Sequence, residues 1–364
     1  MKRFIFFILF VVLAVSAAFA QADLQPVAIV RLTRSEPITV RQLRTELEKL
    51  AWQNWVARAG RVPTAADINR EIQGISIPER RNVLEMMINE RLALQAAERD
   101  RITFTENELN QQILMLRSQM AQSIGRQPTE EEFAMAIRNE TGQDFPAFRE
   151  SLRRQSISNR YLMTAKADMF SSIQVPTEAE IVNHYNLSRA DFTRPETVRF
   201  TMIQVPYGPD TASRTRAREL ANRLTREIDS NPTRFDEAVL RGQAPNSGYQ
   251  AGDGGYIPRN HMAQQVAGAD FMNVAFSLRQ GEVSRLIEGN PGFQIIKITE
   301  VLPQTALGLD DIMDPGTRIT VRQFIANALL QQRQQEILIR ATQELISELR
   351  TGNPFQIMEQ NLNF

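Results

Sequence analysis

The sequence predicts a multidomain α+β protein in which an all-α domain is interrupted by one smaller α+β domain. Three observations lead to this fold class. Apolar residues recur at helical spacing up to residue 190, an alternation with period two begins at Val198, and a long helical stretch runs from Thr317 to Arg350. Spacings near 3.6 and 2 residues distinguish amphipathic helices from half-buried strands. We therefore expect domains at residues 21–190 and 191–303, followed by a C-terminal segment at 304–364.

The first twenty residues have the pattern of a secretory signal peptide. Lys2 and Arg3 precede an apolar run from Phe4 to Ala18, and small residues lie before the expected cleavage point after Ala20. The run is shorter than the roughly 20 apolar residues that a spanning helix needs. We expect export, removal of residues 1–20 and a mature chain that does not span the membrane. An uncleaved anchor is the alternative.

Charge and cysteine content argue against several kinds of site. Lys plus Arg equals 42, Asp plus Glu equals 42, cysteine is absent and there are 2 His. A neutral balance gives no electrostatic reason to bind nucleic acid or an anionic membrane surface. Without thiols the chain can form neither disulfides nor thiolate metal sites. We expect no metal, no cofactor, and stability that comes from apolar burial.

Residues 21–190 contain repeated helix-start signals after a short strand-like run at Val27 to Val30. In each, a threonine is followed three residues later by Glu or Gln, the pattern of a capping box. These pairs are Thr39 with Gln42, Thr105 with Glu108, Thr129 with Glu132, and Thr177 with Glu180. Apolar stripes follow them, and the clearest lies after Pro78: Val83, Leu84, Met87, Ile88, Leu92 and Ala96. The stripes predict several amphipathic helices that share a core.

Residues 191–303 predict a compact α+β domain. Val198, Phe200 and Met202 fall on one face of a strand, and a helix follows up to Ile228. The segment from Arg241 to Asn260 is rich in Gly, Pro, Asn and Ser, which indicates a loop over a binding surface. A short helix at Phe271 to Leu278 and a strand at Gly292 to Val301 complete this domain.

The helical stretch from Thr317 to Arg350 is amphipathic and rich in Gln and Arg. Helices gain most of their stability by packing an apolar face, so a lone helix of this kind needs a partner surface. We expect this helix to pack on the N-terminal helical domain, which makes that domain discontinuous in sequence.

Two sets of motifs resemble known families. The stretch from Asn82 to Ala97, continued by Ile102 and by Thr105 to Glu108, resembles the N-domain of SurA-type periplasmic chaperones. Four further segments look like the parvulin, or PpiC-type, peptidyl-prolyl isomerase domain: Gly252–Tyr256, Ala275–Leu278, Gly281–Ser284 and Gly292–Lys297. The resemblance covers nearly the whole mature chain. It implies a periplasmic holdase for unfolded exported or outer-membrane proteins, made of a SurA-like helical domain with an inserted parvulin-like domain.

The resemblance also assigns site residues. The positions at which parvulins carry two His and a Cys or Asp correspond here to Met202, Ala244 and Gln294. The apolar proline pocket corresponds to Met262 and Phe271, with Phe276 behind them in the core. Neither His184 nor His261 matches a family His position. The barrier to X-Pro rotation is about 20 kcal/mol, and loss of one positioned donor costs about a hundredfold in rate, so we expect weak or absent isomerase activity.

Two alternatives to the chaperone hypothesis remain open. The first is an active isomerase that uses another polar set: Thr201, Asp253, Tyr256 and Gln294. The second is a structural or host-facing envelope component. Two groups of helical-domain residues are candidates either for the core or for a client surface. Methionine adapts to varied partners, and a tryptophan more usually closes a core but can also line a groove. The two groups are Met86, Met87, Met115, Met120, Met135, Met163 and Met169, and Trp52 and Trp55.

Overall fold

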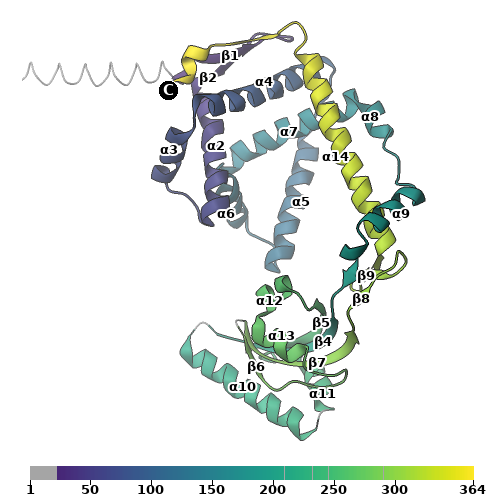
Figure 1. The fold of residues 1–364 in the computed structure, drawn as a ribbon. Helices are drawn as coiled ribbons and strands as arrows, with labels where there is room; N and C mark the ends of the chain where they lie inside the picture. The colour runs from purple at the N-terminus through teal and green to yellow at the C-terminus, as the bar shows by residue number, and fades with distance from the viewer. Residues whose placement is uncertain (1–22, 209, 232, 245, 290) are drawn as a thin grey trace, which may run out of the picture. The chain divides into compact units, whose positions relative to one another are not determined.

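The computed structural model describes residues 23–208, 210–231, 233–244, 246–289 and 291–364. The predicted signal peptide, residues 1–20, lies outside these ranges. The chain divides into two compact units (Figure 1). Unit 1 comprises the chain up to Ile173 together with Arg333–Phe364, and unit 2 is Gln174–Gln332.

Unit 1 is mostly helical. Its helices are α2 (Val40–Ala59), α3 (Ala65–Gly74), α4 (Ile77–Arg99), α5 (Glu106–Ile124), α6 (Glu130–Thr141), α7 (Phe145–Ala165), α8 (Ala167–Ser171), the C-terminal part of α14 (Val321–Leu349) and the short 3-10 helix η2 (Glu359–Leu362). Thr39, Thr105 and Thr129 each form the predicted capping box. Helix α3 begins behind a capping box of Thr64 and Asp67 and was not among the helices predicted from the sequence.

The prediction that residues 21–190 are entirely helical was wrong, because unit 1 contains a small antiparallel sheet. Its strands are β1 (Pro26–Val30), β2 (Glu36–Thr39) and β11 (Phe355–Ile357), in the order β11-β1-β2. Ile29 of β1 lies opposite Gln356 of β11. β1 also pairs locally with β2, where Val30 lies opposite Glu36. The pairing with β11 at the other end of the sequence leaves no local signal, and the apolar run at Val27 to Val30 was the part of the sheet that the sequence indicated.

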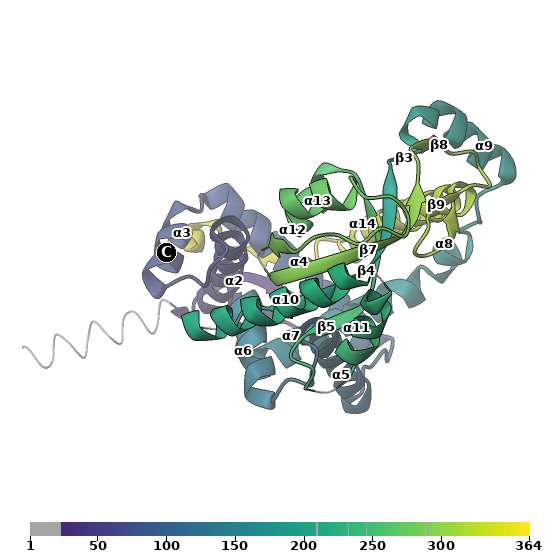
Figure 2. The ribbon, with the colours of Figure 1, turned by 90° about the horizontal axis from the view of Figure 1, so that it is seen from below.

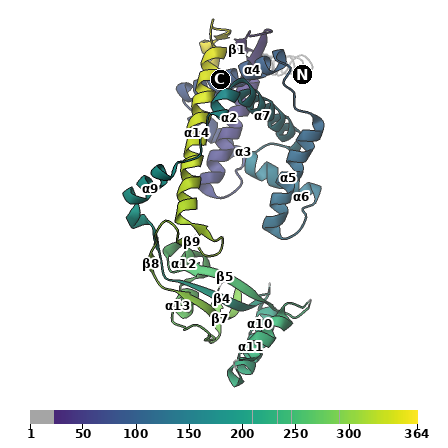
Figure 3. The same cartoon turned by 90° about the vertical axis from the view of Figure 1, so that its right-hand side faces the viewer.

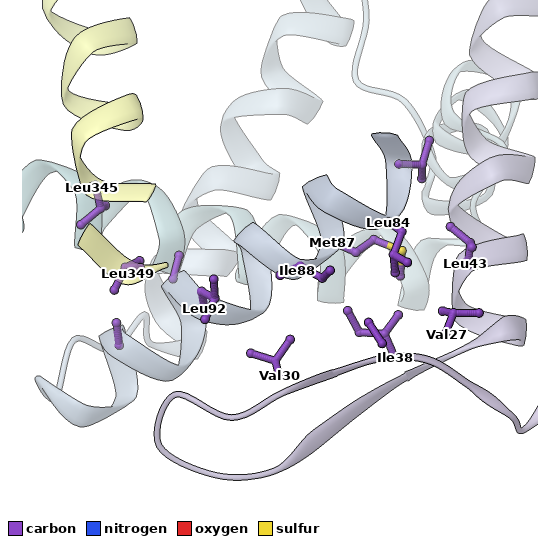
Figure 4. Close-up of a cluster of buried hydrophobic side chains, with 14 of the residues drawn as sticks. Val27, Val30, Ile38, Leu43, Leu84, Met87, Ile88, Leu92, Leu345 and Leu349 are labelled. Carbon is purple, nitrogen blue, oxygen red and sulfur yellow. The ribbon is translucent and has the colours of Figure 1, made fainter. Parts of the chain in front are cut away.

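The core of unit 1 joins the sheet to helices from both ends of the chain (Figure 4). Its labelled members are Val27, Val30, Ile38, Leu43, Leu84, Met87, Ile88, Leu92, Leu345 and Leu349. The apolar stripe of α4 is buried as its spacing predicted. Leu345 and Leu349 come from α14, so residues near both ends of the sequence stabilise one core.

Unit 2 is built on a four-stranded antiparallel sheet in the order β5-β4-β7-β6. The strands are β4 (Thr197–Pro206), β5 (Gln250–Pro258), β6 (Ile287–Gly289) and β7 (Gly292–Leu302). Helices α10 (Thr211–Ser230) and α11 (Arg234–Gly242) cover one face, and α12 (His261–Ala267) and α13 (Ala269–Ala275) cover the other. Figures 2 and 3 show α10 and α13 on opposite sides of β4 and β7.

The remaining elements of unit 2 form a small separate core. They are α9 (Glu178–Leu187), η1 (Arg189–Asp191), β3 (Thr193–Arg194), β8 (Thr305–Ala306), β9 (Ile312–Asp314), β10 (Ile319–Thr320) and the start of α14. Ile181 of α9 packs there with Phe192 and Val321. Because these contacts hold α9 in unit 2, the compact units divide after residues 173 and 332, whereas the sequence suggested boundaries near 190 and 303.

The predicted loop from Arg241 to Asn260 was wrong in its second half, which forms β5. The strand carries a bulge where Phe200 pairs with Gly255 and Thr201 with Asp253. A Cβ added at Gly254 would lie 2.2 Å from the Phe200 ring, and Gly255 has a φ of +77°. The glycines that indicated a loop are therefore required by a bulged strand that packs closely on an aromatic ring.

Candidate functional site

The structure brings Met202 and Gln294 together on one face of the unit 2 sheet. Met202 on β4 lies opposite Ile296 on β7, two residues from Gln294. Residues two apart on a strand share a face, and diagonal neighbours of an antiparallel pair have Cβ atoms within about 8 Å. Gln294 is only 7% exposed, and Met202 packs against the cluster that contains Ile296 and Phe271.

The proposed proline-pocket residues lie in different environments. Phe271 on α13 is buried, and its ring meets that of Phe200 edge-on with centroids 5.2 Å apart. Phe276 packs at the margin of the same cluster, as predicted for a core residue. Met262 on α12 is 76% exposed. Phe271 therefore fills the core beneath α13, and Met262 is available at the surface.

Ala244 does not lie on the sheet face that carries Met202 and Gln294. It is exposed and follows α11, where its N–H donates to the carbonyl of Arg241 at 3.1 Å. Helix α11 packs against the sheet face that carries Ile203, not the face that carries Met202. The position assigned to the third polar group of the family therefore presents a methyl group on a surface turn.

The alternative polar set is divided between the two faces of the sheet. Thr201 alternates with Met202 along β4, so it faces away from Gln294. Asp253 accepts a hydrogen bond from Arg199 at 2.6 Å, and this bond lowers the pKa of the carboxyl group. The hydroxyl of Tyr256 donates to Glu300 at 2.6 Å, which raises the pKa of the phenol. Asp253 and Tyr256 are thus held in surface contacts and do not converge with Gln294.

The two histidines lie in different helices of unit 2. His184 lies in α9, and His261 begins α12. Within the described ranges, no group of three or more His, Cys, Asp or Glu side chains could hold a metal ion. Among the same residues, no helix has both the length and the apolar character needed to cross a membrane.

Some methionines of the helical domain lie in its core, and others lie at its surface. Met87 is buried in the core of unit 1, and Met120 and Met169 pack at the margins of clusters. Four others are more than half exposed: Met86 (60%), Met115 (65%), Met135 (63%) and Met163 (51%). The exposed side chains come from α4, α5, α6 and α7, and they give unit 1 a distributed set of apolar, flexible surface groups.

The two tryptophans also differ in role. Trp52 is half-buried, its Nε1–H donates to the carbonyl of Asn139 at 2.9 Å, and it lines a cavity. The Trp55 ring packs against the guanidinium groups of Arg58 and Arg61, at 5.5 and 4.7 Å from its centroid. Trp55 does not line that cavity. Trp52 therefore takes the groove position that the sequence left open, and Trp55 does not.

A further cavity of about 540 Å³ was not predicted from the sequence. It lies between α2, α4, α7 and α14, with Ala93, Leu162 and Leu345 among its apolar lining residues. At its margin Arg154 pairs with Glu90 at 3.0 Å. Four helices that are distant in sequence supply the lining, so no local motif could have indicated it.

Comparison with known proteins gives two consistent results. A family model described as the PPIC-type PPIASE domain matches residues 176–314. Chaperone SurA of Nitrosococcus oceani is 26% identical over 305 residues, which cover 79% of this chain and 63% of that protein. Chaperone SurA of Chromohalobacter salexigens is 25% identical over 305 residues, which cover 84% of this chain and 63% of that protein.

A probable parvulin-type peptidyl-prolyl cis-trans isomerase of Bordetella bronchiseptica is 22% identical over 224 residues, which cover 56% of this chain and 85% of that protein. The chain spans 63% of the length of the two SurA relatives. Its similarity to them extends through the helical unit as well as the isomerase-type domain. Residues 176–314 therefore match a PPIC-type parvulin domain, within a chain that is similar to SurA chaperones over most of its length.

Proposed function

We propose that the protein is a periplasmic holdase for unfolded exported polypeptides, including outer-membrane β-barrel proteins, and that its PPIC-type domain is an auxiliary binding module with weak or absent isomerase activity. The observation that carries this proposal is the exposure of Met86, Met115, Met135 and Met163 on unit 1. The similarity to SurA chaperones supports the same function. A periplasmic location rests on this similarity and on the predicted signal peptide.

The physical demands on such a holdase fit these side chains. A chaperone without a fuel must release its client spontaneously, so each contact has to be weak and tolerant of sequence. An unbranched, polarisable thioether packs against aliphatic and aromatic groups of many shapes. Several such groups on different helices bind an extended chain at separate points, and the combined affinity can then exceed that of each contact.

The PPIC-type domain has the scaffold of an isomerase with different groups at the family's polar positions. Catalysis of X-Pro rotation requires tighter binding of the twisted amide than of either planar form. Positioned donors and acceptors supply much of this difference. Here the sheet face offers the thioether of Met202 and the amide of Gln294, with an apolar cluster around them. Binding of apolar segments is retained in such a site, and transition-state stabilisation is reduced.

The test of the holdase function measures light scattering by an unfolded β-barrel protein with and without the full chain. We expect wild type to slow aggregation. Replacement of the four exposed methionines by serine should weaken this effect several-fold, and replacement of the same four by leucine should preserve it. Equal far-UV circular dichroism and melting temperature of the variants would show that folding is intact. A wild-type chain that leaves aggregation unchanged would contradict the proposal.

An active isomerase is the second candidate, and the buried amide of Gln294 favours it, because this polar group lies on the sheet face that packs against α13. The discriminating measurement is a protease-coupled proline-peptide assay of the full chain. Robust turnover that Gln294→Ala abolishes would make the protein an isomerase first. Capture of folded rather than unfolded proteins in pull-downs would instead favour a structural or host-facing envelope role.

A further inference from the structure

A cavity of about 630 Å³ lies within unit 1 between α2, α3 and the turn that joins α6 to α7. Helix α2 packs against both α3 and α6, and Figure 1 shows α3 and α6 beside α2. The apolar residues that line the cavity are Trp52, Val62, Pro63, Ala65, Ile68 and Ala147. We call it the Trp52 cavity.

The aromatic wall of this cavity is fixed in place. The Nε1–H of Trp52 is held by the carbonyl of Asn139 at 2.9 Å. Gly142 ends α6 with a φ of +75°, and a Cβ added there would lie 2.8 Å from the Trp52 ring. The backbone of the α6–α7 turn therefore packs directly on the indole. A ring that is ordered before binding loses little conformational entropy when a ligand contacts it.

Another part of the wall is apolar and accessible. Val62, in the segment between α2 and α3, is 45% exposed. Ile68 of α3 is half-buried and lines the same cavity. Exposed aliphatic surface around a fixed aromatic ring is favourable for removal of an apolar group from water, at about 25 cal/mol for each Å² buried.

The polar lining indicates which ligand fits. Glu48 and Arg138 line the cavity with opposite charges, and Lys49, which also lines it, pairs with Glu46 at 2.7 Å. The carboxylate of Asp144 caps α7 by accepting the N–H of Ala147 at 2.9 Å. Asn69 and Asn139 add side-chain amides. A phosphate or a metal ion would meet a like charge here, whereas an uncharged peptide main chain matches this mixture of donors and acceptors.

We propose that the Trp52 cavity holds an apolar side chain of an extended client polypeptide, with the polar lining bonding to the main chain on either side. This inference rests on the proposed holdase function and names one place where the client is held. It assigns Trp52 a binding role in addition to its packing against Gly142.

The chain provides its own reporter, because it contains 2 Trp and Trp55 lies outside the cavity. The full chain with Trp55→Phe would be titrated with the blocked heptapeptide Gly-Ser-Ala-Leu-Ala-Ser-Gly, and the same peptide with Gly in place of Leu would serve as the ligand control. We expect a saturable change in Trp52 emission with the Leu peptide only.

A variant pair tests the location. Val62→Asp places a charge in the cavity at an exposed position and should weaken binding of the Leu peptide about tenfold or more. Ile77→Asp is the matched control, because Ile77 is 47% exposed, belongs to the same unit and does not line the cavity. Binding by the control should equal that of the parent.

The outcomes separate this inference from the proposed function. An unchanged Trp52 spectrum, or equal weakening by Val62→Asp and Ile77→Asp, overturns the inference. If the wild-type chain still slows client aggregation in that case, the holdase function stands and the client is held elsewhere. Saturable, Val62-dependent binding by a chain that fails to slow aggregation supports the cavity as a peptide site and contradicts the holdase function.

Discussion

Met202 and Gln294 lie diagonally across the β4–β7 pair, on the sheet face that packs against Phe271. These are the positions to which the resemblance assigns the two parvulin histidines, and the structure places them within reach of one another. The scaffold therefore places a thioether and an amide on the one sheet face where the resemblance predicts a two-group site.

The double substitution Met202→His and Gln294→His should raise isomerase activity. We expect the full chain with both changes to show roughly tenfold or more activity over wild type in a proline-peptide assay, because two polar groups would again lie beside the twisting amide. Each single change should give a smaller increase. The control pair Ile203→His and Ile295→His lies on the opposite face, where stability should fall without any gain in turnover. Equal activity of wild type and double variant would show that these positions do not flank the substrate.

The capping box of α5 should make unit 1 sensitive to acid. Hydrogen bonds from Arg160 and Thr105 hold the pKa of Glu108 at about 2, below its ordinary 4.5. A lowered carboxyl pKa stabilises the fold above about pH 4.5, and this contribution disappears as the pH falls toward 2. Urea midpoints of wild type and Glu108→Gln should therefore differ at pH 7 and converge at pH 2 to 3.

Glu140→Gln is the control for this experiment, because Glu140 is exposed and forms no ion pair among the described residues. Its urea midpoint should follow wild type at every pH. A gap between wild type and Glu108→Gln that stays constant from pH 7 to pH 2 would contradict the expected titration.

Gln95 should be essential for the turn that joins β1 to β2 in unit 1. Its side chain is fully buried, and its Oε1 accepts the N–H groups of Leu32 and Thr33 at 3.1 and 3.0 Å. Gln95→Leu leaves both backbone donors without this acceptor, which should cost about 2–4 kcal/mol. Urea unfolding followed by tryptophan fluorescence measures this directly, because both tryptophans lie in unit 1. A loss below about 0.5 kcal/mol would mean that water replaces the amide.

Gly254→Ala should destabilise the PPIC-type domain. The added methyl group would lie 2.2 Å from the Phe200 ring, and overpacking of this kind costs about 1–3 kcal/mol. Hydrogen exchange of the β4 amides should accelerate accordingly. Gly252→Ala is the matched control, because a Cβ at Gly252 meets no atom within 4 Å. Equal exchange rates in the two variants would rule out the packing role of Gly254.

Local signals in the sequence were sufficient for most helices. The capping boxes at Thr39, Thr105, Thr129 and Thr177 act within four residues, so the pattern and the structure coincide. The stripe of α4 is also local, since its burial requires only that one face of the helix meet a core. Such features depend little on what the rest of the chain does.

Features that depend on distant partners could not be predicted in this way. The pairing of β1 with β11 and the bonds of Gln95 require segments far apart in sequence. The glycines of β5 were interpreted as a loop, because the Phe200 ring that leaves no room for a side chain at Gly254 lies on another strand. The exposure of Met86 but not Met87 depends on which side of α4 meets the core, and adjacent positions of one helix differ by about 100°.

Because β1 pairs with β11, the sheet of unit 1 can be completed only at the end of synthesis. β1 leaves the ribosome early, yet its partner strand β11 and Leu345 of α14 follow more than three hundred residues later. The PPIC-type domain, with all its strands between these segments, can fold while unit 1 is still incomplete. The newly synthesised chain thus passes through a stage in which its own helical unit is an incomplete polypeptide of the kind that the protein is proposed to hold.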